Sequence, residues 1–304
     1  MTKIIAIVGP TGVGKTKMSI ELAKKLDGEI INADSTQVFR GLDIATAKIT
    51  NKEKEGVKHH LLDIKDITED YTVYDFQLDA MDKIQKIINK GKTPILVGGT
   101  GLYVKALLYG YDFQKEEAFD SFDELTTNEL YETLISLDPE TNIHKNNRKR
   151  IIRAINYMKN TGKPFSSKDK HNEMVYDALV IGLTTDRKKL YEVINARVDD
   201  MFEAGLLKEA KELYDSNIRT KAVMTPIGYK ELFHMFDGVA SLDEVVDMIK
   251  KNSRNYAKRQ MTWFNNQMNV EWFDVDYDNF SKTISEVYDY IEEKKNWFSV
   301  LLLC

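Results

Sequence analysis

The stretch "VGPTGVGKT", residues 8–16, combines three glycines with a lysine and two threonines. It follows the apolar run "KIIAIVG", 3–9, which predicts a strand, and it leads into a helical pattern over about 14–26. A glycine-rich turn between a buried strand and a helix is typical of a loop that binds phosphate. The stretch therefore predicts an open α/β sheet with a phosphate site at one strand end.

The chemistry of this loop agrees with its spacing. Backbone N–H groups can converge on phosphate oxygens, and the N-terminus of the following helix adds partial positive charge. Lys15 supplies a full charge, and the Thr16 hydroxyl can ligate Mg²⁺. The loop predicts a di- or triphosphate ligand and leaves ATP open as that ligand. The predicted diphosphate-binding residues are Gly9, Pro10, Thr11, Gly12, Val13, Gly14, Lys15 and Thr16, with Thr16 as the metal ligand.

Further apolar runs alternate with helical patterns along the chain. They are "EIINAD" 29–34, "HHLLDI" 59–64, "TPILVGG" 93–99, "ALVIGL" 178–183 and the late "VEWFDV" 270–275. Runs of this kind between helices predict parallel strands that are buried on both faces. We expect a P-loop NTPase-like parallel sheet with helices on both faces and an inserted helical domain.

The inserted domain is indicated by a sharp change of charge. Residues 111–140 hold ten acidic side chains against Lys115 alone, whereas 141–170 hold nine basic ones against Asp169. Such runs often form solvated helix faces, but a contrast this large also suits a lobe that turns one face toward a polyanion. We expect a catalytic core over 1–111 and 178–304, with an inserted helical tRNA-binding lobe over 112–177.

The composition restricts the class of protein. The net charge of −5 excludes a uniformly basic nucleic-acid binder, so any RNA contact must come from a local patch. The single cysteine, Cys304, excludes a disulfide framework and a Cys/His zinc site, and it fits a reducing cytoplasm. The N-terminal apolar run and the closing "WFSVLLLC", 297–304, are too short to span a membrane.

Polar groups follow two more of the predicted strands. Asp34 closes the second strand, which we expect beside the first, so its carboxylate should face the phosphate loop. This position suits a general base or a metal ligand, but an aspartate that caps a following helix fits equally well. Ser35, Thr36 and Gln37 could read base edges or simply form a turn. Thr100, after a glycine pair, points to the same crevice.

Two other features have weaker signals. Asp63 at the end of "HLLDI" is a possible magnesium-holding residue, although any strand ending in aspartate would give this match. Lys251, Arg254 and Lys258 form a cationic stripe on a late helix, either as a solvated face or as a second RNA contact. We expect Trp263 and Phe264 on the same helix to belong to the core.

As a set, these residues resemble the bacterial-type tRNA dimethylallyltransferases, also called tRNA isopentenyltransferases. The similarity runs in order along nearly the whole chain. The matching stretches are "GPTGVGKT" 9–16, "INADSTQVFRGLDIATAK" 31–48, "HHLLD" 59–63, "PILVGGTGLYVKALL" 94–108, "RKRIIRAINYMKNTGKP" 148–164, "GYKE" 228–231 and "YAKRQMTWF" 256–264.

The resemblance implies transfer of a dimethylallyl group from its diphosphate to N6 of the adenine 3′ of the anticodon, with diphosphate released and Mg²⁺ as cofactor. It implies catalytic roles for Asp34 and Thr100. It implies a monomeric enzyme with tRNA and dimethylallyl diphosphate as partners and no membrane. The residues that it assigns to tRNA binding are Asp34, Ser35, Thr36, Gln37, Lys149, Arg150 and Arg153.

One departure and three alternatives accompany this interpretation. Many family members carry an arginine early in the insertion, where this chain has the acidic "FDSFDEL", 119–125, so one tRNA contact cannot be carried over. An adenylate isopentenyltransferase or a small-molecule kinase could use the same core, although neither needs the basic insertion. A tRNA-binding protein with a nucleotide switch is the alternative from another class.

Overall fold

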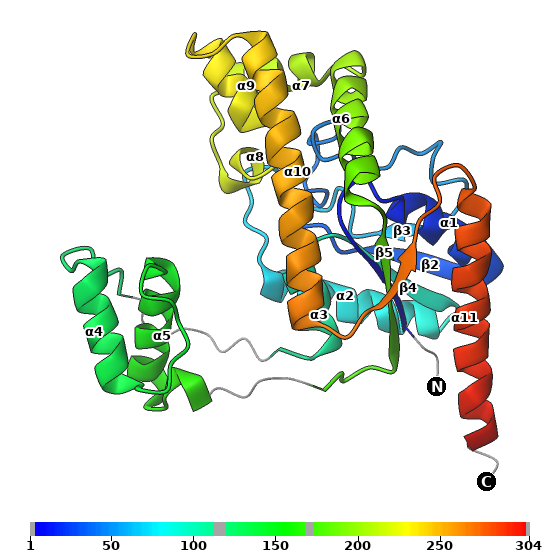
Figure 1. The fold of residues 1–304 in the computed structure, drawn as a ribbon, viewed down its shortest axis with the longest axis horizontal. Coiled ribbons are helices and arrows are strands. Elements are labelled where there is room, and N and C mark those ends of the chain that lie inside the picture. Colours follow the sequence, from blue (N-terminus) through cyan, green and yellow to red (C-terminus); the bar gives the residue numbers. More distant parts are fainter. Residues whose placement is uncertain (1–3, 112–119, 168–172, 302–304) are drawn as a thin grey trace. The chain divides into compact units, whose positions relative to one another are not determined.

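A parallel six-stranded sheet forms the centre of the larger of two compact units (Figure 1). The computed structural model describes residues 4–111, 120–167 and 173–301, with side chains up to 294. The strand order is β3-β2-β4-β1-β5-β6, which confirms the predicted α/β sheet. The strands are β1 (Ile4–Val8), β2 (Gly28–Asn32), β3 (His59–His60), β4 (Thr93–Val97), β5 (Ala178–Thr184) and β6 (Glu271–Asp274).

The structure corrects two expectations about these strands. The first two strands are not neighbours, because β4 lies between β1 and β2 and pairs with both. A helical crossover between parallel strands can skip a place that a later strand then fills, so sequence order does not settle pairing. The third strand covers only two of the residues in 59–64, since Leu61 and Asp63 adopt positive φ and end the extended conformation.

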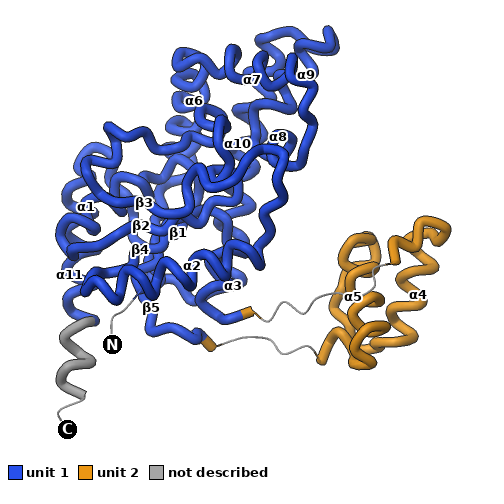
Figure 2. Tube along the Cα trace, turned by 180° about the vertical axis from the view of Figure 1, so that it is seen from behind, with its two compact units in different colours: residues 1–110, 174–304 blue, residues 111–173 orange. Residues whose placement is uncertain are grey.

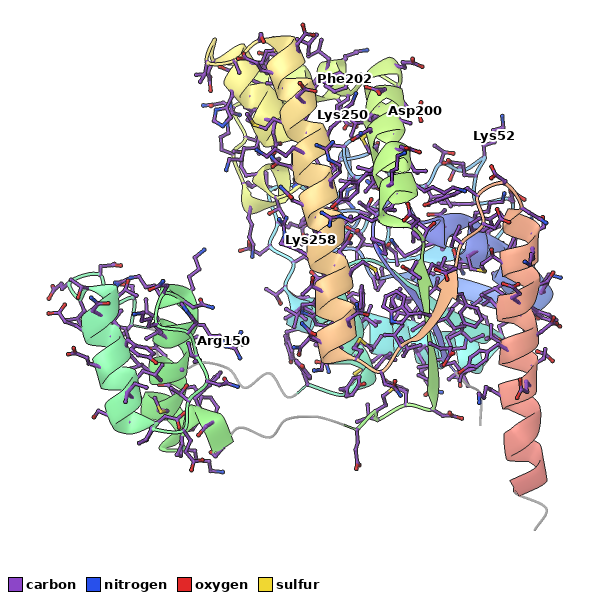
Figure 3. All side chains as sticks on the ribbon, in the orientation of Figure 1. Lys52, Arg150, Asp200, Phe202, Lys250 and Lys258 are labelled. Carbon is purple, nitrogen blue, oxygen red and sulfur yellow. The ribbon has the colours of Figure 1, made fainter. Side chains whose placement is uncertain are left out.

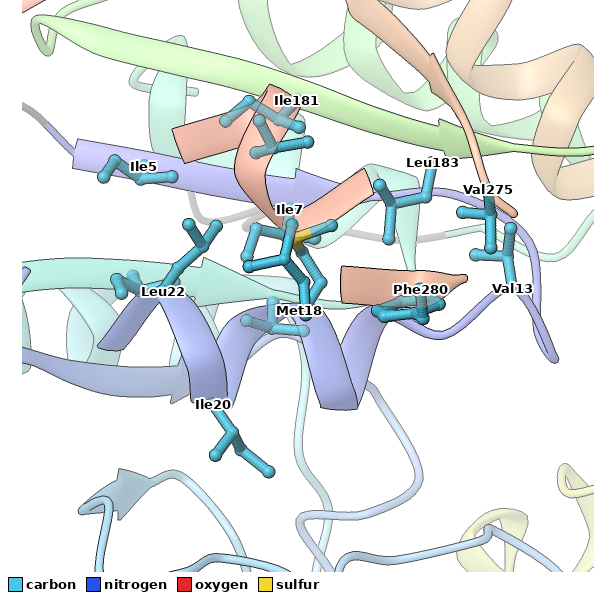
Figure 4. Packing of buried hydrophobic residues seen from close by; sticks show 14 of the residues in the cluster. Ile5, Ile7, Val13, Met18, Ile20, Leu22, Ile181, Leu183, Val275 and Phe280 are labelled. Carbon is cyan, nitrogen blue, oxygen red and sulfur yellow. The ribbon is translucent and has the colours of Figure 1, made fainter. Parts of the chain in front are cut away.

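Both faces of strand β1 are buried. Ile5 and Ile7 pack with Met18, Leu22 and other side chains of a continuous apolar cluster, to which the last helix contributes Phe280 (Figure 4). Successive strand residues point to opposite faces, and Ile4, on the other face, is 1% exposed. The helices α1 (Lys15–Lys25), α2 (Val73–Ile88) and α11 (Phe280–Leu301) contact the sheet, and α3 (Gly101–Leu108) packs on α2.

Five helices after β5 form a second apolar cluster, seen together in Figures 1 and 2. They hold the loop after β2 by burying Val38, Phe39 and Leu42 among their own side chains. The longest begins at a capping box formed by Ser241 and Glu244, which satisfies two backbone donors of its first turn. These helices are α6 (Arg187–Glu203), α7 (Leu206–Asp215), α8 (Lys221–Met224), α9 (Tyr229–Phe236) and α10 (Leu242–Gln267).

The second compact unit covers 111–173, against the predicted 112–177, and the first covers 1–110 and 174–304 (Figure 2). It contains α4 (Thr127–Leu137), α5 (Arg148–Thr161) and a short 3₁₀ helix, η1 (Phe165–Ser167), around an apolar cluster of its own. Part of the acidic stretch packs on α5, where Arg148 donates to the carbonyls of Leu125 and Phe122 at 2.7 and 2.8 Å.

Two of the nine basic residues of 141–170, Lys168 and Lys170, lie outside the described residues. The same holds for the side chains of the closing apolar stretch. Over the part of the chain that the structure describes, no helix is both long enough and apolar enough to cross a membrane.

Glu29 is an acidic side chain buried in β2. It is 5% exposed, and its carboxylate lies 2.7 Å from Nε2 of His60 on β3 and 3.0 Å from Nζ of Lys90. Burial acts to raise the pKa of Glu29, but the hydrogen bonds from His60 and Lys90 outweigh it and hold that pKa below its usual value. The interaction ties β3 and the end of α2 to the sheet.

We predict that Glu29→Gln lowers the free energy of unfolding at pH 7 by about 2 kcal/mol, the value of a buried hydrogen bond to a charged group. Since the folded-state pKa lies below the unfolded one, this stabilisation exists above the unfolded pKa and disappears as pH falls through the folded one. Urea denaturation from pH 7 downward should show the two proteins converging in acid.

Asp27→Asn is the matched control. Asp27 pairs with Lys92 at 2.6 Å, but its side chain is 77% exposed, and asparagine tolerates its positive φ. We expect a change below about 0.5 kcal/mol at pH 7. Equal losses of unfolding free energy in Glu29→Gln and Asp27→Asn would contradict a special role for the buried Glu29 carboxylate.

Candidate active site

The carboxyl ends of β1, β4 and β2 open into a cleft of about 900 Å³. The phosphate loop follows β1, the turn with Thr100 follows β4, and Asp34 follows β2. These three predicted groups line the same cleft, as do side chains from α6 and α10. The cleft lies entirely within the larger unit.

The phosphate loop leads directly into α1, whose first turn has no side-chain cap. Gly14 is the N-cap residue at φ 95°, and no side chain caps the helix, so the first-turn N–H groups are not used by a cap. Gly9, at φ 140°, has room for hydrogen only, since a Cβ there would lie 2.5 Å from the Leu183 carbonyl oxygen. An uncapped helix N-terminus that follows a glycine-rich turn is the kind of position at which phosphate binds.

Lys15 is folded back onto the loop. Its ammonium donates to the carbonyls of Gly9 and Pro10 at 3.0 and 2.7 Å. Burial and the neighbouring Arg197 charge lower the pKa of Lys15 to about 7, and the Asp34 carboxylate offsets them in part. A diphosphate in the cleft would favour the charged form.

Arg197, on α6, is a functional candidate that no sequence motif indicated. Its guanidinium donates to the Thr11 hydroxyl at 3.3 Å. Burial lowers the pKa of Arg197, while the Asp34 charge acts in the opposite direction. The loop therefore has two cations beside it, Lys15 from α1 and Arg197 from α6. Its ligand should accordingly carry several negative charges.

Asp34 does not cap a helix, because no helix follows it. Its Oδ1 accepts from the backbone N–H and the hydroxyl of Thr36 at 2.9 and 2.6 Å, which makes a local turn. Its charge also contributes to the pKa of Lys15, Arg197 and Tyr256. The carboxylate thus lies in the middle of the polar cleft even though β2 is not beside β1.

Thr100 connects the ends of two strands. Its hydroxyl accepts from the backbone N–H of Ser35 at 3.2 Å and lies 3.4 Å from the Ser35 hydroxyl. Gln37 points elsewhere in the cleft, since its amide donates to the carbonyls of Thr46 and Ala47 at 2.9 and 3.4 Å. The predicted 34–37 segment is therefore an ordered part of the wall.

Gln260, on α10, was not predicted as a site residue. Its amide oxygen accepts from the N–H of Thr11 at 2.8 Å, and its amide nitrogen donates to the Gly99 carbonyl at 3.0 Å. One turn earlier, Tyr256 lies beside Thr100 and Gln260, and burial followed by the Asp34 charge raises its pKa to about 12. The only sequence signal for both was the family-specific stretch 256–264.

A metal ion fits this cleft only with help from its ligand. Thr16 and Asp34 both line the cleft, but the described residues contain no group of three acidic, histidine or cysteine side chains that could hold a metal. Mg²⁺ commonly takes one or two protein oxygens and completes its shell with phosphate and water. Asp63 is not among the lining residues, and its carboxylate binds Lys48 at 2.6 Å.

The basic residues predicted to bind tRNA lie on the smaller unit. Lys149, Arg150 and Arg153 are exposed on α5, and Figure 3 labels Arg150 there. The helix begins at Asn147, whose side chain accepts from the Arg150 N–H. It ends at Gly162 in the left-handed conformation.

The cationic stripe of α10 differs from the expected one. Arg254 is engaged by Asn195, to which it donates at 2.6 Å, whereas Lys258 is exposed (Figure 3). Phe264 is fully buried, but Trp263 is half-buried, and its ring fills the space next to Gly101. The residues lining a shallow groove on the outer face of α10 are Asn255, Lys258, Arg259, Thr262, Trp263, Asn266 and Gln267.

Comparisons with known proteins agree with one another. A family model described as IPP transferase matches residues 37–267. The tRNA dimethylallyltransferase of Anoxybacillus flavithermus is 48% identical over 301 residues, covering 96% of this chain and 97% of that protein. That of Bacillus subtilis is 48% identical over 284 residues, 90% of each.

Solved structures give the same result. The tRNA isopentenylpyrophosphate transferase from Bacillus halodurans has a TM-score of 0.79 and 45% identity, with 100% of both chains covered. A eukaryotic dimethylallyltransferase described as acting on tRNA has a TM-score of 0.85 and 31% identity, covering 96% of this chain and 80% of that one.

We predict that diphosphate binding takes up a proton at Lys15. At pH 8 a lysine of pKa about 7 is mostly neutral, and the bound anion should restore its charge, so uptake should approach about one proton. Affinity should accordingly fall as pH rises from 7 to 9. Calorimetry with inorganic diphosphate in buffers of different ionisation enthalpy measures the uptake.

Lys15→Arg serves as the control, because arginine stays charged over this range. The proton exchange of diphosphate itself is common to both proteins and cancels in the difference. The same proton count for the wild type and the variant would contradict the assignment to Lys15.

Proposed function

Since this chain belongs to the IPP transferase family, we propose that it transfers a dimethylallyl group from dimethylallyl diphosphate to N6 of the adenine 3′ of the anticodon in tRNA, releasing diphosphate. One observation carries the proposal. The phosphate loop, with Lys15 and Arg197, shares its cleft with the Asp34 carboxylate. Cations that can hold a leaving diphosphate therefore lie in the same cleft as a base that can accept a proton.

Asp34 is proposed as the general base. The adenine amine is a poor nucleophile because its lone pair is delocalised into the ring, but its N–H becomes acidic as the new bond to carbon forms. In the transfer, the N6–carbon bond forms, the carbon–oxygen bond to diphosphate breaks, and the N6 proton moves to the carboxylate. Thr36 holds one oxygen of Asp34, and that contact orients the group.

The departing diphosphate gains negative charge as the bond breaks. The backbone N–H groups of residues 12–16, the Lys15 ammonium and the Arg197 guanidinium are proposed to stabilise that charge where it develops. Mg²⁺, held by Thr16 and the diphosphate, would supply further neutralisation when bound. Thr100 is proposed to position the attacked amine, because its hydroxyl lies next to the segment that begins at Asp34.

The target base must leave its stack to enter the cleft, and an unpaired anticodon loop makes this less costly than a duplex. Ser35, Thr36 and Gln37 are proposed to contact it. Lys149, Arg150 and Arg153 are proposed to bind the backbone phosphates of the stem-loop. One chain supplies the whole cleft, which supports a monomer, and a tRNA substrate together with the single cysteine supports a cytoplasmic location.

We predict that Asp34→Asn lowers kcat for tRNA modification about 10²–10⁴-fold, the usual contribution of a general base. Affinity for inorganic diphosphate should be kept or increased, because the variant loses a negative charge near Lys15 and Arg197. Mass spectrometry of unmodified tRNA incubated with the enzyme and dimethylallyl diphosphate measures the product. A parallel incubation replaces tRNA with AMP. Product formed on AMP but not on tRNA would instead favour an adenylate isopentenyltransferase.

Asp66→Asn is a matched control, since Asp66 accepts from the N–H and hydroxyl of Thr68 in the same turn geometry, but on the surface. It should leave kcat within about twofold, as surface substitutions usually do. Unchanged turnover in the Asp34 variant would remove Asp34 from the mechanism.

For the smaller unit, we predict that reversing the charges of Arg150 and Arg153 to Glu weakens tRNA binding. The negative slope of log K, the association constant, against log salt should decrease in magnitude by about two, one unit for each lost phosphate contact. Filter binding across a salt series measures it. Lys163→Glu, an exposed reversal outside α5, is the comparison, and an equal slope change there would make the effect one of net charge.

A further inference from the structure

One wall of the cleft is a loop that the sheet does not support. Residues 43–48, here called the wall loop, place Ala45, Thr46 and Ala47 on the cleft surface. Two internal hydrogen bonds shape the loop, from the N–H of Ala47 to the Ile44 carbonyl and from that of Lys48 to the Asp43 carbonyl, both at 2.9 Å. These short-range bonds give the loop its shape but do not fix its position relative to the rest of the cleft.

The wall loop is held by a carboxylate from α7. Glu209 accepts from the N–H groups of Asp43 at 3.1 Å, Ile44 at 2.9 Å and Ala45 at 3.2 Å. The hydroxyl of Tyr229, on α9, donates to the same carboxylate at 2.6 Å. Figure 1 shows α7 and α9 together at one end of the larger unit.

A carboxylate fits this arrangement. Four donors converge on its two oxygens, and it has no hydrogen of its own to oppose them. The Ile44 and Ala45 donors and the phenol reach Oε1, while the Asp43 and Ile44 donors reach Oε2. An amide in either orientation would turn an NH₂ group toward at least one backbone N–H.

The wall loop is in turn bonded to the segment proposed to contact tRNA. Gln37 donates its amide hydrogens to Thr46 and Ala47, so the position of the loop sets the position of that side chain. The phosphate loop has a separate anchor, the Gln260 amide on α10. The wall loop and the phosphate loop are thus held by side chains of different helices.

From these contacts we propose that Glu209 is a positioning residue for the RNA side of the site. It holds the wall loop, and through Gln37 the 34–37 segment, in the conformation that accepts the anticodon loop. The inference rests on the proposed function for the identity of the RNA. It predicts that a defect at Glu209 appears in tRNA binding and leaves diphosphate binding intact.

The test is Glu209→Gln, assayed for the dissociation constant of tRNA, the affinity for inorganic diphosphate, the melting temperature, and KM and kcat for tRNA modification. We expect tRNA binding to weaken about tenfold or more, the effect of losing a charge-assisted hydrogen bond. The KM for tRNA should rise in parallel. Diphosphate affinity should stay within about twofold, because its anchor is untouched.

Two further variants are compared with Glu209→Gln. Glu212→Gln changes an exposed glutamate of the same helix, whose partner Lys208 lies at 3.9 Å, and should behave as the wild type. Tyr229→Phe removes one of the four donors and should give an intermediate loss of tRNA affinity. Graded loss in this order, with diphosphate affinity constant, supports the proposal.

The contrary outcomes are distinct. Unchanged tRNA affinity in Glu209→Gln would overturn the proposal, and so would a parallel loss of diphosphate affinity, which would indicate general destabilisation. Because binding is measured without turnover, a wild-type protein that binds tRNA but does not modify it would contradict the proposed function and still test Glu209. Absence of tRNA binding by the wild type would contradict both.

Discussion

The turn that follows β4 has almost no space around its backbone, and the site depends on that close packing. A Cβ on Gly98 would lie 2.2 Å from the carbonyl oxygen of Ala33, and one on Gly99 would lie 2.1 Å from the Gln260 amide. On Gly101 it would meet the Trp263 ring at the same 2.1 Å. Three glycines thus let β2 and α10 approach the turn together, which brings Asp34, Thr100 and the phosphate loop into one cleft.

The charges in that cleft favour an anionic ligand. Lys15 and Arg197 lie near each other, and burial disfavours the charged form of both cations. The Asp34 charge offsets this in part for both, and the Glu53 charge does so for Arg197. A diphosphate relieves this by supplying negative charge close to the loop. In the proposed reaction the same arrangement separates the roles of the carboxylate and the cations, with the cations holding the leaving group and the carboxylate accepting the proton.

The two walls of the cleft are supported by different helices. Gln260 bonds the phosphate loop to the turn after β4, whereas Glu209 bonds the wall loop to α7. Each support uses a side chain with the right number of donors and acceptors for the backbone groups it meets. The helices after β5 therefore hold the loops of the cleft in place as well as burying an apolar cluster.

The sequence by itself determined the parallel sheet, the phosphate loop and the family, because glycine spacing and apolar runs are local properties of the chain. It also placed Asp34 and Thr100 at strand ends that meet in one cleft. It could not determine that β4 separates β1 from β2, since parallel pairing depends on how the crossovers pack. Nor could it identify Arg197, Gln260 and Glu209 as supports of the site. Their partners in the loops of the cleft are 161 to 249 residues away along the chain, and only tertiary packing brings such distant groups within hydrogen-bonding distance.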